Sequence, residues 1–182
     1  MPMKAATAFE KWFGASKVVG ADGAPLVVYH GSKHSFTEFD RAALGGNFDN
    51  CVSRQGFYFT NDRSIANAYS WDREKNCAGN TINAYLSLQN PVYINGAAFG
   101  ATANDYASLS KAIDDAKARG HDGAVIRNWK DGSGAMVQYV AFEPSQIKSA
   151  LGNFGEFEAA NNDIRFSLVD LDEEISTEAP CP

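Results

Sequence analysis

The chain has 182 residues, of which 45% are apolar and 21% are charged, a composition that fits a globular protein with its own core and excludes a disordered or membrane-embedded chain. No window approaches the roughly 18 consecutive apolar residues of a membrane span, and the first residues lack the apolar core of a signal peptide. The net charge of −6 comes mainly from residues 168–182, which carry five acidic side chains and no basic one, leaving −1 for residues 1–167. We therefore expect a cytoplasmic protein with one domain over residues 1–167 and an acidic flexible tail or linker over residues 168–182.

The cysteines and histidines do not form a metal-binding pattern. Cys51, Cys77 and Cys181 are an odd number without metal-type spacing, so we expect free thiols in a reducing compartment. A Gly-Ser turn separates His30 from His34, and the third histidine lies in an Asp-Gly turn, so the sequence predicts no zinc site. Neither a Cys–His nucleophile nor a phosphate-binding loop is indicated.

The first half of the chain predicts short elements around one long loop. An aromatic helical spacing indicates a short first helix, and the run at 61–74 indicates a second, with Thr60 or Asn61 as its N-cap. Residues 40–55 show no period and contain a Gly-Gly pair, which is typical of a long, mobile and functional loop. The expected elements are a helix within 6–16, strands at 26–31 and 56–60, a further short strand at 35–40, and the helix at 61–74.

The second half predicts the longest helix between strands. Residues 104–120 have the strongest helical pattern and end at Gly120 as the C′ residue. The other expected elements are one or two strands within 80–94 broken at Pro91, a strand at 122–129, a tight loop at 130–134, a strand at 135–143 stopped by Pro144, and a final edge strand at 162–167. Many short strands with few helices and no regular βαβ alternation predict an α+β fold with a largely antiparallel sheet.

Two short motifs contain residues suited to ligand binding. His30 ends a strand and is followed by Gly31, where backbone can approach a ligand; an ordinary half-buried histidine before a turn is the simpler interpretation. Tyr58 lies on a strand and Tyr69 on the following helix. Either tyrosine alone would be read as core packing, but together they can form two aromatic walls around a flat heterocycle.

One strand carries a polar residue where its pattern predicts an apolar one. In "AMVQYVAF", residues 135–142, Gln138 shares a face with Met136, Val140 and Phe142 if side chains alternate. An amide at this position is either a satisfied core residue or part of a site.

These motifs together resemble a known superfamily. "VVYHGS", then "GFYFT" followed by "ANAY", then "QYVAFEPSQIKSA" are similar to the ADP-ribosyltransferase superfamily in its diphtheria-toxin and poly(ADP-ribose)-polymerase-like branch. The similarity is greatest to the ADP-ribosyltransferase domains of phage and mobile-element polyvalent proteins, and it spans roughly residues 8–167. It implies a split antiparallel sheet with flanking helices and a cleft for NAD, which is the substrate, without a metal.

The resemblance also implies roles for individual residues. His30 would hydrogen-bond a ribose hydroxyl, Gly31 would bind the nicotinamide carboxamide through its backbone with Ser32 beside it, and Tyr58 and Tyr69 would sandwich the nicotinamide ring. Loop 40–55 would cover the phosphates with Arg41 and Arg54 as its cations, and loop 128–134 would face the acceptor. The family's catalytic glutamate falls on Gln138, where this chain departs from the pattern.

The departure predicts binding without efficient turnover. A carboxylate at position 138 would contact the ribose 2′-OH and stabilise an oxocarbenium-like transition state. Glutamine keeps the shape but loses the charge, which typically costs on the order of 10²–10³ in rate. Strict alternation points Glu143 to the opposite face, and Glu156 and Glu158 belong to a Gly-bounded loop, so we expect no ready replacement. Three explanations stay open: an engineered inactive variant, a natural variant with slow or different chemistry, and a pseudoenzyme.

The sequence therefore predicts a mono-ADP-ribosyltransferase, an NAD-dependent enzyme that modifies a macromolecular acceptor. Met136 cannot serve as the polar group of arginine-specific members, so the acceptor is not arginine by that route. Protein is favoured over nucleic acid, because residues 1–167 are nearly neutral. The alternatives are an NAD-binding interaction module, a nucleic-acid ADP-ribosyltransferase and an NAD glycohydrolase. We expect a monomeric toxin or effector, with an immunity or antitoxin protein as a further partner.

Overall fold

The computed structural model describes residues 6–46, 50–100, 102–130, 135–152, 157 and 160–164. The predicted tail at 168–182, most of the predicted loop at 130–134, and Glu156 and Glu158 lie outside these residues.

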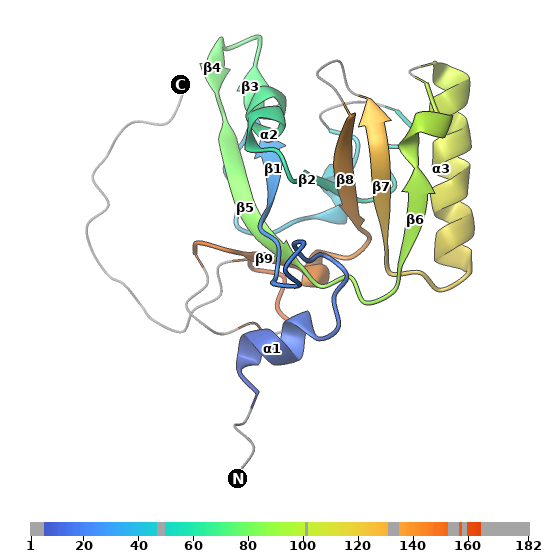
Figure 1. Cartoon of the computed structure of the whole chain (residues 1–182). Coiled ribbons are helices and arrows are strands. Elements are labelled where there is room, and N and C mark those ends of the chain that lie inside the picture. Colours follow the sequence, from blue (N-terminus) through green and yellow to red (C-terminus); the bar gives the residue numbers. More distant parts are fainter. Residues whose placement is uncertain are drawn as a thin grey trace.

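A seven-stranded sheet forms the centre of the molecule, in the order β6-β7-β8-β2-β1-β5-β9 (Figure 1). Neighbouring strands are antiparallel except β6 and β7, which are parallel and are joined by helix α3. The α+β prediction is confirmed, although the sequence did not reveal this one βαβ unit. The strands are β1 Val28–Ser32, β2 Phe57–Thr60, β5 Asn80–Leu86, β6 Pro91–Asn95, β7 Gly123–Lys130, β8 Ala135–Ala141 and β9 Ile147–Ser149, and β3 Trp71–Asp72 pairs with β4 Cys77–Ala78 in a separate hairpin.

The helices begin and end at residues with clear capping roles. Thr7 and Glu10 form a capping box at the start of α1, and Gly120, with φ of +80°, follows α3 as predicted. The N-cap of α2 is Asp62, which accepts from the Ser64 amide at 2.8 Å. Neither Thr60 nor Asn61 is therefore the cap. The helices are α1 Ala8–Phe13, α2 Arg63–Ser70 and α3 Ala103–Ala118, with 3-10 turns η1 Arg41–Ala43, η2 Gly96–Ala98 and η3 Pro144–Gln146.

Two further sequence expectations about local structure are wrong, and a third lies partly outside the described residues. Residues 35–40 are not a strand: Glu38 makes a single bridge to Asp163, and the aromatic side chains of the segment pack into the interior. Helix α2 ends at Ser70 instead of residue 74, because Trp71 and Asp72 enter β3. Of the edge strand predicted at 162–167, residues 162–164 contain only the bridge from Asp163 to Glu38, and residues 165–167 lie outside the described residues; the edges of the sheet are β6 and β9.

The cysteine expectation also needs a correction. Cys77 of β4 is disulfide-bonded, whereas Cys51 is a free thiol. The expectation of free thiols is thus wrong for Cys77, because sequence spacing does not show which sulfur atoms approach each other in space.

Two hydrophobic cores lie on opposite faces of the sheet. The first core includes Val28, Phe39, Phe57, Phe59, Val125, Tyr139 and Ile147. The second core includes Val52, Leu109, Ile113, Ile126, Met136, Val140 and Phe142. Ile65 of α2 packs against the second core, which α3 supplies with Leu109 and Ile113, so both helices cover the same face.

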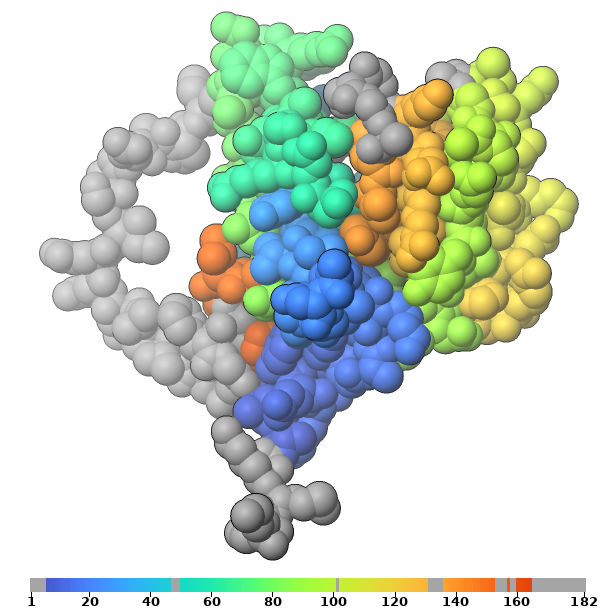
Figure 2. All heavy atoms as spheres, in the orientation of Figure 1, coloured from blue at the N-terminus to red at the C-terminus, as the bar shows by residue number. Residues whose placement is uncertain are grey.

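The sheet is nearly divided between β1 and β2. All five residues of β1 pair with β5, but only Tyr29 pairs with β2, opposite Thr60. Helix α2 lies over β1 and β5, and α3 lies along β6 and β7 (Figure 1). Figure 2 shows α2 (teal) beside the β7–β8 region (orange), with α3 (yellow) beyond it. The candidate residues His30, Tyr58 and Gln138 therefore lie on β1, β2 and β8, on either side of this division.

Candidate functional site

Gln138 is placed by strand β8 on the helix-covered face of the sheet. It lies opposite Thr60 of β2 and Ile126 of β7. Its amide nitrogen is 3.9 Å from the sulfur of Met136, a buried residue of the second core. Since residues opposite each other in an antiparallel pair point to the same face, Gln138 and Thr60 project together. The amide is half-buried and presents a neutral polar end to this face.

Tyr58 projects from the neighbouring strand onto the same face as Gln138. It pairs with Val140, two residues after Gln138, so the two side chains are diagonal neighbours. The Tyr58 hydroxyl donates to the Val52 carbonyl at 2.9 Å. Burial raises the pKa of this phenol well above its usual range, and the proximity of Cys51 adds to the shift. Tyr58 is therefore a neutral aromatic wall with a fixed hydroxyl.

Tyr69 is carried by α2 on the side of that helix that faces the sheet. It lies one turn after Ile65, and residues four apart share one helix face. Ile65 packs against the second core together with Tyr58. Tyr58 thus projects onto the helix-covered face with Gln138, and Tyr69 is half-buried on the helix that covers this face.

The His30 ring lies on the opposite face of the sheet, so the structure does not bring it to the face that carries Gln138 and Tyr58. Its side chain packs against Phe39 and Phe59 of the first core, with ring centroids 5.0 and 5.4 Å apart. Its Nδ1 lies 2.8 Å from the carbonyl oxygen of Tyr58, so Nδ1 carries the proton and donates. Burial lowers the pKa of His30, and the bond to the Tyr58 carbonyl raises it by less. The result is a neutral imidazole with Nε2 as its second polar atom, tied to the Tyr58 backbone.

Gly31 is required by the packing of α2 on β1. A Cβ atom at this position would lie 1.9 Å from the Ala66 carbonyl oxygen and 2.9 Å from the Ser70 nitrogen. The close approach at Gly31 is thus made by helix backbone, and a contact with a ligand stays a prediction. Ser32 follows with 8% exposure, and its hydroxyl accepts from the His34 amide at 3.1 Å.

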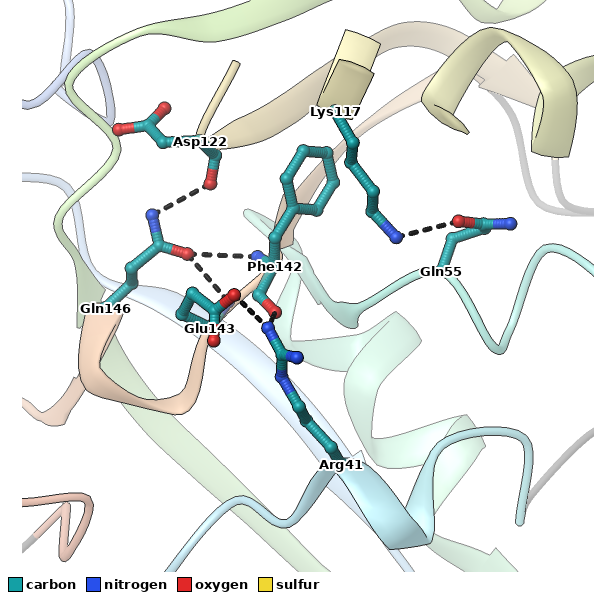
Figure 3. Close-up of polar contacts among 7 residues, drawn as sticks. All are labelled: Arg41, Gln55, Lys117, Asp122, Phe142, Glu143 and Gln146. Atoms are coloured by element: carbon teal, nitrogen blue, oxygen red, sulfur yellow. Dashed lines mark hydrogen bonds and ion pairs between the residues drawn. The ribbon is translucent and has the colours of Figure 1, made fainter. Parts of the chain in front are cut away.

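The two predicted cations of loop 40–55 occupy different places. Arg41 forms an exposed ion pair with Glu143 and lies 3.4 Å from the Phe142 carbonyl (Figure 3). At about 3.3 Å per residue, Phe142 is about 13 Å along the strand from Gln138. The Arg54 side chain lies beside Gly45: a Cβ atom added at Gly45 would be 3.0 Å from the Cγ of Arg54. The structure therefore does not bring Arg41 to Gln138, and the role of both arginines at the phosphates stays a prediction.

A pocket of about 350 Å³ opens beside the Arg41–Glu143 pair. Its other lining residues include Glu38, Asp40, Ser145 and Asn162. Phe39 also lines it and packs on the His30 ring, so one aromatic ring separates the pocket from the imidazole. Residues 131–134, which would border the predicted cleft, lie outside the described residues. The candidate site is thus defined by Tyr58 and Gln138 rather than by this pocket.

Loop 40–55 is anchored to α3 by residues that the sequence did not identify. The Gln55 amide donates to the Ser110 hydroxyl at 2.7 Å and accepts from the Lys117 ammonium at 2.8 Å (Figure 3). The Ser110 hydroxyl also lies 3.3 Å from the Cys51 carbonyl. Residues 51–55 are therefore tied to α3 by hydrogen bonds, and the mobility expected of the loop stays a prediction. No sequence signal links positions 55 residues apart.

The described residues contain no group of three or more histidine, cysteine or acidic side chains that could hold a metal ion. In the same part of the chain, no helix combines the length and apolar character needed to cross a membrane.

A family model matches most of the chain. The model of the family described as ADP-ribosyltransferase in polyvalent proteins matches residues 20–157, which is more than half of the chain. No curated protein matches the sequence.

Proposed function

Because the chain belongs to the family of ADP-ribosyltransferases in polyvalent proteins, we propose that it binds NAD and transfers ADP-ribose to a macromolecular acceptor. The position of Gln138 carries the proposal. It projects beside Tyr58 on a face that α2 also covers, and α2 carries Tyr69. These are the positions that the resemblance assigns to the catalytic side chain and to the two walls of the nicotinamide site.

Each residue has a role that its surroundings permit. The neutral His30 imidazole donates Nδ1–H to the Tyr58 carbonyl from the opposite face of the sheet, so it supports the strand that carries Tyr58, and a contact of Nε2 with a ribose hydroxyl stays a prediction. Tyr58 and Tyr69 offer aromatic faces to the nicotinamide ring. The amide of residue 138 has an oxygen that can accept from the ribose 2′-OH. No step in this arrangement requires a metal.

Gln138 makes the proposed site better at holding NAD than at breaking its glycosidic bond. Nicotinamide leaves as positive charge develops on the ribose, and a neutral amide stabilises that charge far less than a carboxylate. Glu143 is paired with Arg41 at the far end of β8 and is not a substitute. An NAD-binding module without transfer is the second candidate function, and the neutral Gln138 is the observation that favours it.

We further propose a protein acceptor and an effector role. The buried Met136 occupies the position that arginine-specific members fill with a polar residue, which supports an acceptor other than arginine. The near-neutral body, with a net charge of −1 over residues 1–167, favours protein over nucleic acid. A monomer acting in the cytoplasm of the producing or target cell, and neutralised by an immunity or antitoxin protein, completes this proposal.

Binding and transfer are tested separately. NAD binding is measured by calorimetry for the chain as it stands, for Tyr69→Ala, and for Tyr93→Ala as a control at a 53% exposed tyrosine on β6. We expect binding that Tyr69→Ala weakens at least tenfold and that Tyr93→Ala leaves unchanged, since stacking on an aromatic side chain contributes on the order of 1–3 kcal/mol. No binding by the parent chain, or equal loss in both variants, contradicts the proposed site.

Transfer is followed with labelled NAD in a cell lysate, using Gln138→Glu. Label that protease removes and nuclease does not would support a protein acceptor. Label sensitive only to nuclease would instead assign nucleic acid, and nicotinamide release without label would assign an NAD glycohydrolase.

A further inference from the structure

We propose that Gln55 is a positioning residue, which clamps residues 50–55 to helix α3 and so fixes the carbonyl group that orients the Tyr58 hydroxyl. The inference rests on the proposed function, because it assigns Gln55 to the support of a predicted nicotinamide wall.

The Gln55 side chain uses both ends of its amide on one face of α3. Nε2 donates to the Ser110 hydroxyl at 2.7 Å and lies 3.2 Å from an Asp114 carboxylate oxygen, while Oε1 accepts from Lys117 at 2.8 Å. The three partners are spaced by four and three residues, so they share one side of the helix. A single side chain is thus held by two turns of helix.

The backbone next to Gln55 transmits this anchoring to Tyr58. The Val52 carbonyl accepts two hydrogen bonds, one from the backbone N–H of Gln55 and one from the Tyr58 hydroxyl, each 2.9 Å long. Ser110, a partner of the Gln55 side chain, also bonds the Cys51 carbonyl beside Val52. The position of the Val52 oxygen therefore depends on the contacts of Gln55 with α3. The orientation of the Tyr58 hydroxyl depends in turn on that oxygen, which accepts its hydrogen bond.

Lys117 joins the clamp to the strand that carries Gln138. Its ammonium lies 4.9 Å from the ring centroid of Phe142, the residue after β8 (Figure 3). Burial lowers the pKa of Lys117, while Asp114 raises it and Arg41 lowers it. The ammonium is thus partly withdrawn from water and fixed by an amide and an aromatic face. Helix α3, loop 50–55 and the end of β8 meet at Gln55 and Lys117.

A merely structural role would make Gln55 important for stability alone, and a double-mutant cycle separates the two roles. NAD dissociation constants are compared for the parent chain, Gln55→Ala, Tyr58→Phe and the double variant. Gln55→Ala removes the side-chain contacts to Ser110, Asp114 and Lys117, and because the effect reaches Tyr58 through one hydrogen bond, it should weaken NAD binding about fivefold to tenfold. If Gln55 acts through the Tyr58 hydroxyl, the double variant should bind no more weakly than Tyr58→Phe alone. If the losses of NAD affinity in Gln55→Ala and Tyr58→Phe instead multiply in the double variant, the inference is overturned.

Lys117→Ala provides a second disruption of the clamp, with Lys111→Ala as its matched control. Lys111 lies on the same helix, where its ammonium pairs with Asp115 at 2.7 Å in an exposed i,i+4 arrangement. We expect Lys117→Ala to reproduce the effect of Gln55→Ala and Lys111→Ala to bind NAD like the parent. Equal binding by the two lysine variants would contradict the clamp.

A measurement without NAD keeps the inference separate from the proposed function. The Tyr58 phenol is followed by carbon-13 NMR of its Cζ atom as the pH is raised, with Tyr58→Phe for assignment. It should stay protonated at pH 11 in the parent chain and titrate closer to the ordinary value of about 10 in folded Gln55→Ala. Unchanged titration in Gln55→Ala overturns the clamp. If the parent chain does not bind NAD, the proposed function fails, and this titration alone decides the role of Gln55.

Discussion

Replacing Gly31 with alanine should displace helix α2 from strand β1. The added Cβ would lie 1.9 Å from the Ala66 carbonyl oxygen, so backbone must move by about 1.5 Å to reach an ordinary contact distance. Overpacking of this kind typically costs about 3 kcal/mol when backbone is involved. The loss of chain freedom in the unfolded state returns about 0.7 kcal/mol. We therefore expect Gly31→Ala to lower the free energy of unfolding by about 2 kcal/mol.

Urea unfolding followed by tryptophan fluorescence measures this change, with Gly46→Ala as the control. Gly46 is exposed, its nearest non-neighbouring atom would lie 3.1 Å from the new Cβ, and its φ is not positive. The control should change stability by less than about 0.5 kcal/mol. Because β1 carries His30 and α2 carries Tyr69, Gly31→Ala should also weaken NAD binding. A loss of stability no larger than that of Gly46→Ala would refute the close packing of α2 on β1.

Three further predictions concern the frame of the site. Since burial lowers the folded-state pKa of His30, the unfolded chain takes up the proton first, and the free energy of unfolding should fall by up to about 1.4 kcal/mol per pH unit below about pH 6.5. Urea unfolding at pH 5 and pH 7 should show a smaller fall in His30→Gln than in the parent chain, and an equal fall would contradict this. Gln146→Ala should lower the free energy of unfolding by about 3 kcal/mol, because Oε1 of Gln146 accepts from the backbone amides of Phe142 and Glu143 and Nε2 donates to the Asp122 carbonyl at 2.8 Å (Figure 3). A change of less than about 1 kcal/mol in urea unfolding would contradict this. Lys148→Met should lower the melting temperature, because the fully buried ammonium donates to the carbonyls of Asn161 and Asp163, whereas Lys111→Met at an exposed site should not.

Local sequence patterns predicted most of the secondary structure, because their signals lie within a few residues. The spacing of Phe9, Trp12 and Phe13 marked α1, and Gly120 marked the end of α3. The segment at 35–40 misled because Phe36 and Phe39 pack around the His30 ring instead of joining a sheet. Tertiary contacts outweighed local propensity at that segment.

The candidate site was predictable only as far as its residues lie in recognisable motifs. Tyr58 and Gln138 do come to one face of neighbouring strands, as their positions in the resemblance imply. The bond from His30 to the Tyr58 carbonyl and the clamp of Gln55 on α3 were not predictable, because they join residues 28 to 62 positions apart. Arg41 pairs with Glu143 in the structure, and the role expected of it at the phosphates stays a prediction.

The central claim is that this is a transferase site whose activity is limited by the missing charge at residue 138. The most direct test is the rate of nicotinamide release from NAD by Gln138→Glu relative to the parent chain, with NAD affinity measured for both. The account predicts release faster by on the order of 10²–10³, with dissociation constants within about tenfold of each other. Equal rates of release in the two proteins, while both bind NAD, would contradict it.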